Sequence, residues 1–516
     1  MNRTPKSVLL LLVLITFASV IIGRGFTALN PGWSDAQLFM YVGDQWLLGR
    51  IPYVDIWDNK PPGIFALIAL IFSFYPKSLT ALAIFEGLFI LGCVTTVYLL
   101  VRKVLNFWPS AALSTVAAAV ACNLLVYNER GVLTEIFLLW PATLSMLCFV
   151  KGIEARETRW ILMAGFCAGL ASLFKTPGLS PLLAQIGFIV LLVLYKYYDL
   201  SKAVVLITAG LAGMILAWLP AVLYFSSHGA LADLFDATLF YNLSYGSASQ
   251  PGLHSIIMNL LYRLEPVAPL TVSAAIATVI IVTDALRSHK NTGVDKKNIT
   301  GNEFPWGILL VLWIFADLAG VMAGGRYYPH YFLALIPSLS VLAGFAYSLI
   351  VGPGNRSIKM NTKALIAVLL IIVGPLFFQQ AGDLRSLRWL IIDGAPKADW
   401  QIVADKLNMI REPNDMLFIW GYQPGIFYET GMKSPSRLLD PHYLGGSEKA
   451  RNKFGQEMFD SLEKNNPSFI VVRTSDDAIQ AKLVTIFNQL KAFMNNSYEL
   501  IDVVGKLEIY RKIKSG

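Results

Sequence analysis

Residues 35–62 read DAQLFMYVGDQWLLGRIPYVDIWDNKPP, and this stretch decides how the rest of the chain is interpreted. Apolar runs lie close on both sides of it, yet it carries four carboxylates and a lysine that directly precedes two prolines. These charged residues are Asp35, Asp44, Asp55, Asp58 and Lys60. Charged side chains next to lipid are costly and are usually kept for a function. The stretch therefore predicts a functional site at the edge of a membrane.

The composition is that of a polytopic membrane protein. Of the 516 residues, 55% are hydrophobic and only 15% are charged, whereas soluble domains carry about a quarter charged residues. The formal net charge is +8, but the basic residues occupy short loops between apolar runs, which excludes nucleic acid as a partner. The four cysteines all lie inside apolar runs, so neither a disulfide framework nor a zinc site is indicated.

Eleven apolar runs have about the length that a membrane crossing requires. They cover residues 7–23, 79–101, 109–126, 132–150, 160–174, 179–195, 203–225, 266–284, 306–322, 331–350 and 363–380. The first follows Arg3 and Lys6 and reads as an uncleaved span that starts in the cytoplasm. A further run, 63–75, is too short for a confident span.

The basic residues settle the topology of that short run. If it lies at the outer interface and does not cross, every Lys and Arg cluster between spans falls on one side, as the positive-inside rule requires. We therefore expect about eleven spans plus interfacial helices in the plasma (inner) membrane, with the N-terminus cytoplasmic and the C-terminus outside. The outer stretches are then 35–62, 127–130, 175–177, 226–265, predicted as a long loop, and 326–330.

From about residue 395 the pattern changes to alternating helices and strands. Helices are predicted at 399–410, 447–465 and 476–494, strands at 416–420 and 468–472, and a hairpin of 499–504 with 507–511 around Gly505. We expect a transmembrane domain over residues 1–394 and an extracytoplasmic α/β domain over residues 395–516. No nucleotide-binding motif occurs in the latter.

Asp35 has the pattern of a residue in the first turn of a helix. Ser34 suits the N-cap position and Gln37 completes a capping box. The helix dipole then favours an ionised carboxylate, which can act as a general base for a hydroxyl. The alternative is that Asp35 only helps to cap the helix. Asp44 is half a turn out of phase and reads as a solvated residue, and Gly49 ends the helix.

Lys60 precedes Pro61 and Pro62, and with Pro52 these prolines predict an extended segment from Tyr53 to Pro62. A lysine at the start of an interfacial helix is a natural phosphate ligand. The alternative is an interfacial lysine that only extends its ammonium toward water.

Further polar residues are expected on the same outer face. Lys175, Arg326 and His330 stand at outer ends of spans beside tyrosines such as Tyr328, and each alone could be an interfacial anchor. Glu135 is close enough to the outside to join them. Glu86 and Asp317 read as buried structural partners. Asp35, Asp58 and His330 could hold a divalent metal, but no spacing demands one.

Four segments resemble the GT-C membrane glycosyltransferases that use polyprenyl-phosphate sugars, the superfamily of protein O-mannosyltransferases and the lipid A aminoarabinose transferase. They are WSDAQLF around Asp35, DNKPP around Lys60, LFKTP around Lys175 and RYYPHYF from Arg326. The resemblance implies that Asp35 is the catalytic base and that Lys60, Arg326 and His330 contact the lipid phosphate. The predicted binding residues are Lys60, Asp58, Lys175, Arg326, His330, Glu135 and Tyr328.

Two departures from the family pattern leave a metal requirement open. Many relatives have Asp-Glu at the first position, where this chain has Asp35-Ala36, and some place an acidic metal ligand where Asn59 stands. The resemblance implies an inverting single displacement from a polyprenyl-phosphate-linked sugar to a hydroxyl on a protein, lipid or glycan. A transporter or flippase of a lipid-linked sugar is the main alternative, and a scaffold acting through the α/β domain is a third.

Overall fold

The structure is a computed structural model that describes residues 3–29, 35–128, 131–247, 252–290, 304–351, 362–439, 441–445, 448–474 and 483–513. The chain divides into two units. Unit 1 comprises residues 1–30, 79–223 and 251–393, and unit 2 comprises residues 31–78, 224–250 and 394–516. The stretch 35–62 therefore belongs to the same unit as the C-terminal region.

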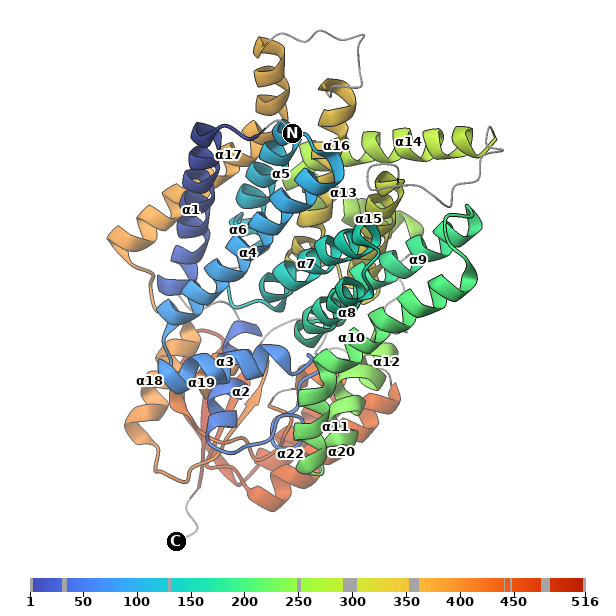
Figure 1. Ribbon diagram of the computed structural model, residues 1–516. Coiled ribbons are helices and arrows are strands. Elements are labelled where there is room, and N and C mark those ends of the chain that lie inside the picture. Colours follow the sequence, from blue (N-terminus) through green and yellow to red (C-terminus); the bar gives the residue numbers. More distant parts are fainter. Residues whose placement is uncertain are drawn as a thin grey trace. The chain divides into compact units, whose positions relative to one another are not determined.

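Unit 1 is built from apolar helices. They are α1 (Lys6–Leu29), α4 (Leu79–Leu105), α5 (Trp108–Ala121), α6 (Leu125–Asn128), α7 (Thr134–Ala155), α8 (Thr158–Phe174), α9 (Ser180–Leu194), α10 (Leu200–Ser227), α13 (Leu253–Leu264), α14 (Ala268–Lys290), α15 (Trp306–Met322), α16 (Ile336–Val351) and α17 (Thr362–Asp393). Helix α1 packs on α4, α4 on α7, and α7 on α8, so that these four lie side by side (Figure 1).

Each of the eleven predicted apolar runs overlaps one of these helices; the run 109–126 extends from α5 into α6, and the run 331–350 begins in a 3₁₀ helix before α16. Among the described residues, eight stretches are long and apolar enough to cross a membrane, at residues 6–29, 79–105, 134–155, 176–194, 200–227, 253–287, 329–351 and 367–393. Helices α5, α8 and α15 are apolar but shorter. The predicted class, a multi-span helical membrane protein, is confirmed, whereas the number of spans and their orientation stay predictions.

Unit 2 combines helices with one small sheet. Its helices are α2 (Asp35–Leu47), α3 (Gly63–Phe74), α11 (Leu231–Phe235), α12 (Tyr241–Ser247), α18 (Asp399–Ile410), α19 (Pro424–Thr430), α20 (Glu448–Asn465) and α22 (Val484–Met494). The outer stretch 226–265, expected as a long connection between spans, contains helices: α11, a π-helical turn over 236–240, α12 and α13 lie in it. The buried side chains of Leu234 and Ala237 explain the helical structure there.

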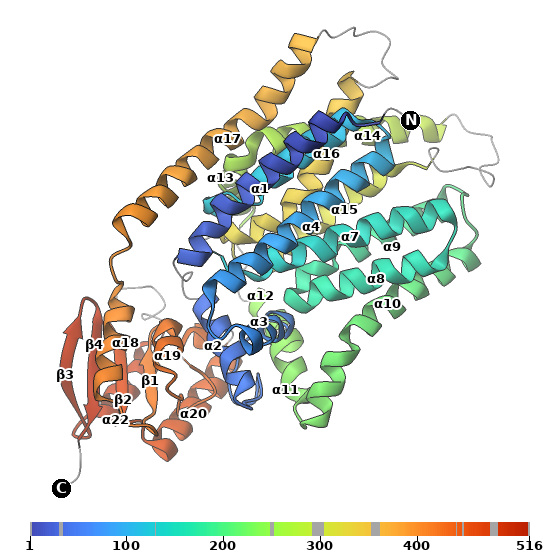
Figure 2. The same cartoon turned by 60° about the vertical axis from the view of Figure 1, so that its left-hand side comes forward.

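The sheet confirms the α/β pattern read from the C-terminal sequence. Its strands β1 (Leu417–Trp420), β2 (Phe469–Arg473), β3 (Tyr498–Val504) and β4 (Leu507–Lys512) have the order β1-β2-β4-β3 (Figure 2). Strands β1 and β2 are parallel and almost wholly buried, whereas β3 and β4 form an antiparallel hairpin. Gly505, at φ 57°, makes the turn of that hairpin.

One buried ion pair connects three segments of unit 1. Arg24 of α1 donates from Nη1 to Oε2 of Glu86 of α4 over 2.8 Å, and both side chains are at most 4% exposed. Thr27 also donates to Oε2 over 2.7 Å, while Oε1 accepts the backbone N–H of Val132. Glu86 is thus the structural partner that the sequence suggested, and it fixes the segment that leads into α7.

We predict that Glu86→Ala destabilises the protein by about 3–5 kcal/mol, because it leaves the Arg24 guanidinium buried without its counter-charge. The measurement is thermal unfolding in detergent. Glu157→Ala is the control, since Glu157 pairs with Arg159 at the surface and an exposed pair contributes about 0–1 kcal/mol. Equal unfolding temperatures for the two variants would contradict the role of the buried pair.

Candidate active site

A group of side chains in unit 2, here called the loop cluster, contains three of the sequence-predicted residues. Its members are Asp35, Asp58, Lys60, Tyr422 and Tyr443. Asp35 lies in the first turn of α2, as expected, and its side chain is partly exposed. Tyr422 donates from its hydroxyl to Asp35 Oδ1 over 2.5 Å. Ser34, the expected N-cap, lies outside the described residues.

Asp58 is the buried centre of the loop cluster, with 1% of its surface exposed. Its Oδ1 accepts the backbone N–H of Lys60 over 2.7 Å and lies 3.6 Å from the Lys60 ammonium, while Oδ2 accepts from Tyr443 over 3.3 Å. Burial raises the pKa of Asp58; Lys60 and Tyr443 oppose this shift, and the charge of Asp35 adds to it. The buried Asp58 and the partly exposed Asp35, both in the loop cluster, are therefore in different environments.

Lys60 is held from several directions. Its ammonium donates to Asn59 Oδ1 over 3.0 Å and lies 5.6 Å from the ring centroid of Phe39 on α2. Its carbonyl accepts from the Tyr53 hydroxyl over 2.8 Å. The side chain is 20% exposed, so the ammonium is neither sealed in the core nor fully in water.

The backbone before Lys60 differs from the extended segment that the prolines predicted. Tyr53 has φ 71° and donates its N–H to the carbonyl of Ile56 over 2.7 Å, which makes a tight turn. The reason is the neighbouring Trp57, whose ring is buried against Tyr241, Tyr443 and Phe454 at centroid distances of 4.6–5.0 Å. Burial of these large rings outweighs the local preference of the chain.

A second group, here called the cation cluster, lies in unit 1 and contains Glu135, Lys175, Tyr328, His330 and Tyr331. Glu135, in the first turn of α7, forms an ion pair with Lys175. The Lys175 ammonium lies 3.5 Å from the ring centroid of Tyr331. The His330 ring lies 4.8 Å from Tyr331 and stacks parallel to Tyr328 at 5.7 Å.

Local backbone structure places the two basic side chains of this cluster, Lys175 and His330. Lys175 is the extended residue between the end of α8 and a 3₁₀ turn over 176–179, and His330 lies in a 3₁₀ helix over 329–335. Arg326 is half-buried just before that helix, in a segment held by a hydrogen bond of 2.8 Å from Arg263 to the carbonyl of Tyr327. Tyr328 is 41% exposed, so part of this segment faces outward from unit 1.

Asp317 is hydrogen-bonded to the segments that follow Lys175 and His330. It accepts from Ser180, which begins α9 after Lys175, and from Ser338 of α16 over 2.6 Å. Like Glu86, it is the buried structural partner that the sequence suggested.

Sequence reasoning missed two members of the loop cluster, Tyr422 and Tyr443, and one residue that contacts its neighbour Asn59. Tyr422 and Tyr443 come from the C-terminal region, and Asn242 of α12 exchanges hydrogen bonds of 2.9 Å with Asn59. The available signal was the position of Tyr422 two residues after the end of a buried strand, where parallel strands commonly present functional residues. Within the described ranges no three His, Cys, Asp or Glu side chains are grouped as a metal site would need, so the suggested set of Asp35, Asp58 and His330 gains no support.

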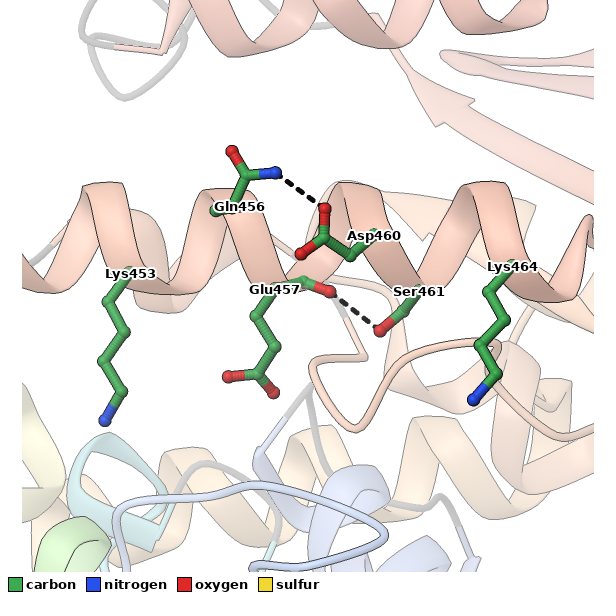
Figure 3. Close-up of a pocket in the computed structure, with 6 residues that line it drawn as sticks. All are labelled: Lys453, Gln456, Glu457, Asp460, Ser461 and Lys464. Carbon is green, nitrogen blue, oxygen red and sulfur yellow. Dashed lines mark hydrogen bonds between the residues drawn. The ribbon is translucent and has the colours of Figure 1, made fainter.

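A surface groove along α20 is a different kind of site. Figure 3 shows it, lined by Lys453, Gln456, Glu457, Asp460, Ser461 and Lys464. Gln456 already donates to Asp460 over 2.6 Å, and Glu457 pairs with Arg437 at 2.5 Å. Its charges are mixed, and none of the sequence-predicted residues lines it.

Comparisons with known proteins define the class. A family model described as dolichyl-phosphate-mannose-protein mannosyltransferase matches residues 59–224. Among solved structures, ArnT from Cupriavidus metallidurans bound to undecaprenyl phosphate has a TM-score of 0.60 at 12% identity and covers 99% of both chains. The archaeal oligosaccharyltransferase AglB from Archaeoglobus fulgidus, in complex with an inhibitory peptide and a dolichol-phosphate, has a TM-score of 0.57 at 14% identity over 99% of this chain and 74% of its own.

The arabinofuranosyltransferase AftD from Mycobacteria has a TM-score of 0.51 at 12% identity and covers 97% of this chain and 41% of that one. No curated protein matches the chain by sequence. The fold is that of the GT-C membrane glycosyltransferases, which confirms the resemblance seen in the sequence. The family model covers about a third of the chain, and what the solved structures share with it is the fold.

The raised pKa of Asp58 predicts how stability changes with pH. The folded protein binds the Asp58 proton more tightly than the unfolded chain does, so this residue's contribution falls as pH rises from the ordinary value of 3.8 to the folded pKa. Asp58→Asn cannot titrate and should lack that decline in unfolding temperature. Asp44→Asn is the control and should retain it. Identical pH profiles for wild type and Asp58→Asn would contradict the burial effect.

Proposed function

We propose that this protein is an inverting glycosyltransferase that moves a sugar from a polyprenyl-phosphate carrier to an acceptor hydroxyl. The observation that carries the proposal is the loop cluster, where a partly exposed carboxylate, Asp35, and a fixed lysine, Lys60, both act on the buried carboxylate of Asp58. The reaction needs a base for the acceptor and cations for the departing phosphate. Both types of group occur on a fold shared with glycosyltransferases.

In the proposed reaction Asp35 is the general base. It takes the proton of the acceptor hydroxyl as the oxygen bonds to the anomeric carbon, and the bond from that carbon to the phosphate oxygen breaks. Asp58 does not suit this role, because it is buried and engaged by the backbone of Lys60 and by Tyr443. Its role is to hold Lys60.

Lys60, Lys175, Arg326 and His330 are proposed to bind the phosphate and to stabilise the charge that develops on it. Glu135 balances Lys175 in the free protein, and Tyr328 and Tyr331 line the approach with aromatic rings. The same class of ligand is found in relatives, since the ArnT structure contains undecaprenyl phosphate and the AglB structure a dolichol-phosphate.

A transporter or flippase would also use cations for phosphate, but it would not need a base. The structural relatives with this fold are named as glycosyltransferases, which favours transfer over transport. We propose the topology of the sequence analysis for the reaction, with a cytoplasmic N-terminus and the α/β region outside the cell. The sugar is a hexose or pentose, and the acceptor is a hydroxyl of a protein, a lipid or an envelope glycan.

We predict that Asp35→Asn lowers transfer by at least about 100-fold, because the acceptor loses its general base. The measurement uses purified protein with polyprenyl-phosphate mannose and polyprenyl-phosphate arabinofuranose as donors, and the envelope glycans and lipids of a deletion strain as acceptors. Asp44→Asn, on the same helix and paired with Lys77, is the matched control and should transfer normally. Transfer by Asp35→Asn at the wild-type rate would remove Asp35 from the mechanism.

We also predict that Lys60→Ala and Lys175→Ala each weaken binding of undecaprenyl phosphate about tenfold or more, since each removes a charged hydrogen-bond donor. Affinity can be measured by microscale thermophoresis in detergent. Lys77→Ala is the control, because Lys77 pairs with Asp44 and contacts Tyr428 at the far end of α2. A loss confined to the control, or no loss in the two test variants, would refute the phosphate assignment.

A further inference from the structure

The C-terminal region reaches both carboxylates of the loop cluster through tyrosines. Tyr422 donates to Asp35 and Tyr443 donates to Asp58, across sequence separations of 387 and 385 residues. A phenol that donates to a carboxylate makes a charge-assisted hydrogen bond, which is stronger and more directional than a neutral one. The C-terminal region is therefore hydrogen-bonded to both carboxylates of the loop cluster, Asp35 and Asp58.

Tyr422 is placed by a constrained turn. Strand β1 is buried along its whole length and ends at Trp420, and Gly421 follows with φ 124°. A side chain at Gly421 would put its Cβ 2.6 Å from the Cβ of Arg473 on the neighbouring strand. Only glycine fits this turn, so the direction in which Tyr422 leaves the sheet is fixed.

The helix that carries Asp35 is held against the same region. Gly425 of α19 lies so close to α2 that a Cβ there would be 2.6 Å from Oε1 of Gln37. One turn further along, the Tyr41 hydroxyl donates to the carbonyl of Met432 over 2.8 Å, and its ring packs on Phe427 at 5.5 Å. The 2.5 Å bond between Asp35 and Tyr422 therefore joins two elements that are already fixed to each other.

We propose that Tyr422 is a positioning residue for the catalytic base, so that the C-terminal α/β region completes the catalytic centre. The inference rests on the proposed function, in which Asp35 accepts the proton of the acceptor. Tyr422 keeps its own proton throughout. Its hydroxyl fixes one carboxylate oxygen of Asp35 and favours the ionised form, the form that a base must have before the acceptor arrives.

Among the described residues, the charged groups near Asp35 include Asp58 and Lys60 of the loop cluster. Asp58 opposes ionisation of Asp35, and Lys60 offsets this because it pairs with Asp58. Helix α19 brings Tyr428 and Glu429, which face Lys77 and Asp44. In addition to these charges, the Tyr422 hydroxyl stabilises the ionised Asp35 carboxylate through a direct hydrogen bond.

The test is Tyr422→Phe, which removes one hydroxyl and keeps the ring. We expect kcat to fall about tenfold with the donor KM unchanged, since a hydrogen bond to a charged group is lost. The acid limb of the pH–kcat profile should move to higher pH. A readout that needs no substrate is labelling of Asp35 by a carbodiimide, followed by mass spectrometry, whose pH midpoint should also rise.

Tyr41→Phe is the matched control. It removes a hydroxyl from the same contact between α2 and α19 but leaves Asp35 untouched. If Tyr422→Phe has the wild-type pH midpoint for labelling, or if Tyr41→Phe shifts it equally, the positioning role is refuted. These results can occur while Asp35→Asn is still inactive, in which case only the inference fails. If Asp35→Asn transfers sugar normally, the proposed function fails and the inference with it.

Discussion

Burial of the Asp58 carboxylate is the constraint on which the loop cluster depends. An ionised group removed from water is costly unless it is paired and hydrogen-bonded. The loop meets this requirement with the backbone N–H and the ammonium of Lys60 and with the hydroxyl of Tyr443. As a consequence, Lys60 is fixed in place before any ligand binds, and the C-terminal region is joined to the loop.

Three buried carboxylates of unit 1 are likewise paired or hydrogen-bonded, and they differ in how exposed their partners are. The Arg24–Glu86 pair is at most 4% exposed and its bonds all go to neighbouring segments of the chain, which suits a structural role. Asp317 is buried between two serines. In the Glu135–Lys175 pair the lysine is 15% exposed and lies against Tyr331, so this cation can reach a ligand. Exposure of the cation therefore separates the candidate phosphate ligands from the structural pairs.

The sequence predicted the helical membrane class, the C-terminal α/β pattern and a helix that contains Asp35, because hydrophobic periodicity decides these features. It did not predict the turn at Tyr53, since burial of Trp57 among rings from distant segments overrides the local effect of the prolines. It also missed Tyr422 and Tyr443. Their contacts with Asp35 and Asp58 depend on how the chain returns to the loop almost 400 residues later, and no local pattern encodes that.

The central claim is that the loop around Asp35 and Lys60 meets the phosphate of a lipid-linked sugar. The most direct measurement is photo-crosslinking with an undecaprenyl phosphate that carries a diazirine beside the phosphate, followed by mapping of the labelled peptides. The account predicts labelling of the peptide that contains Lys60, and its loss when excess unmodified undecaprenyl phosphate is added. Labelling that avoids residues 35–62 and is equally strong with and without competitor would contradict it.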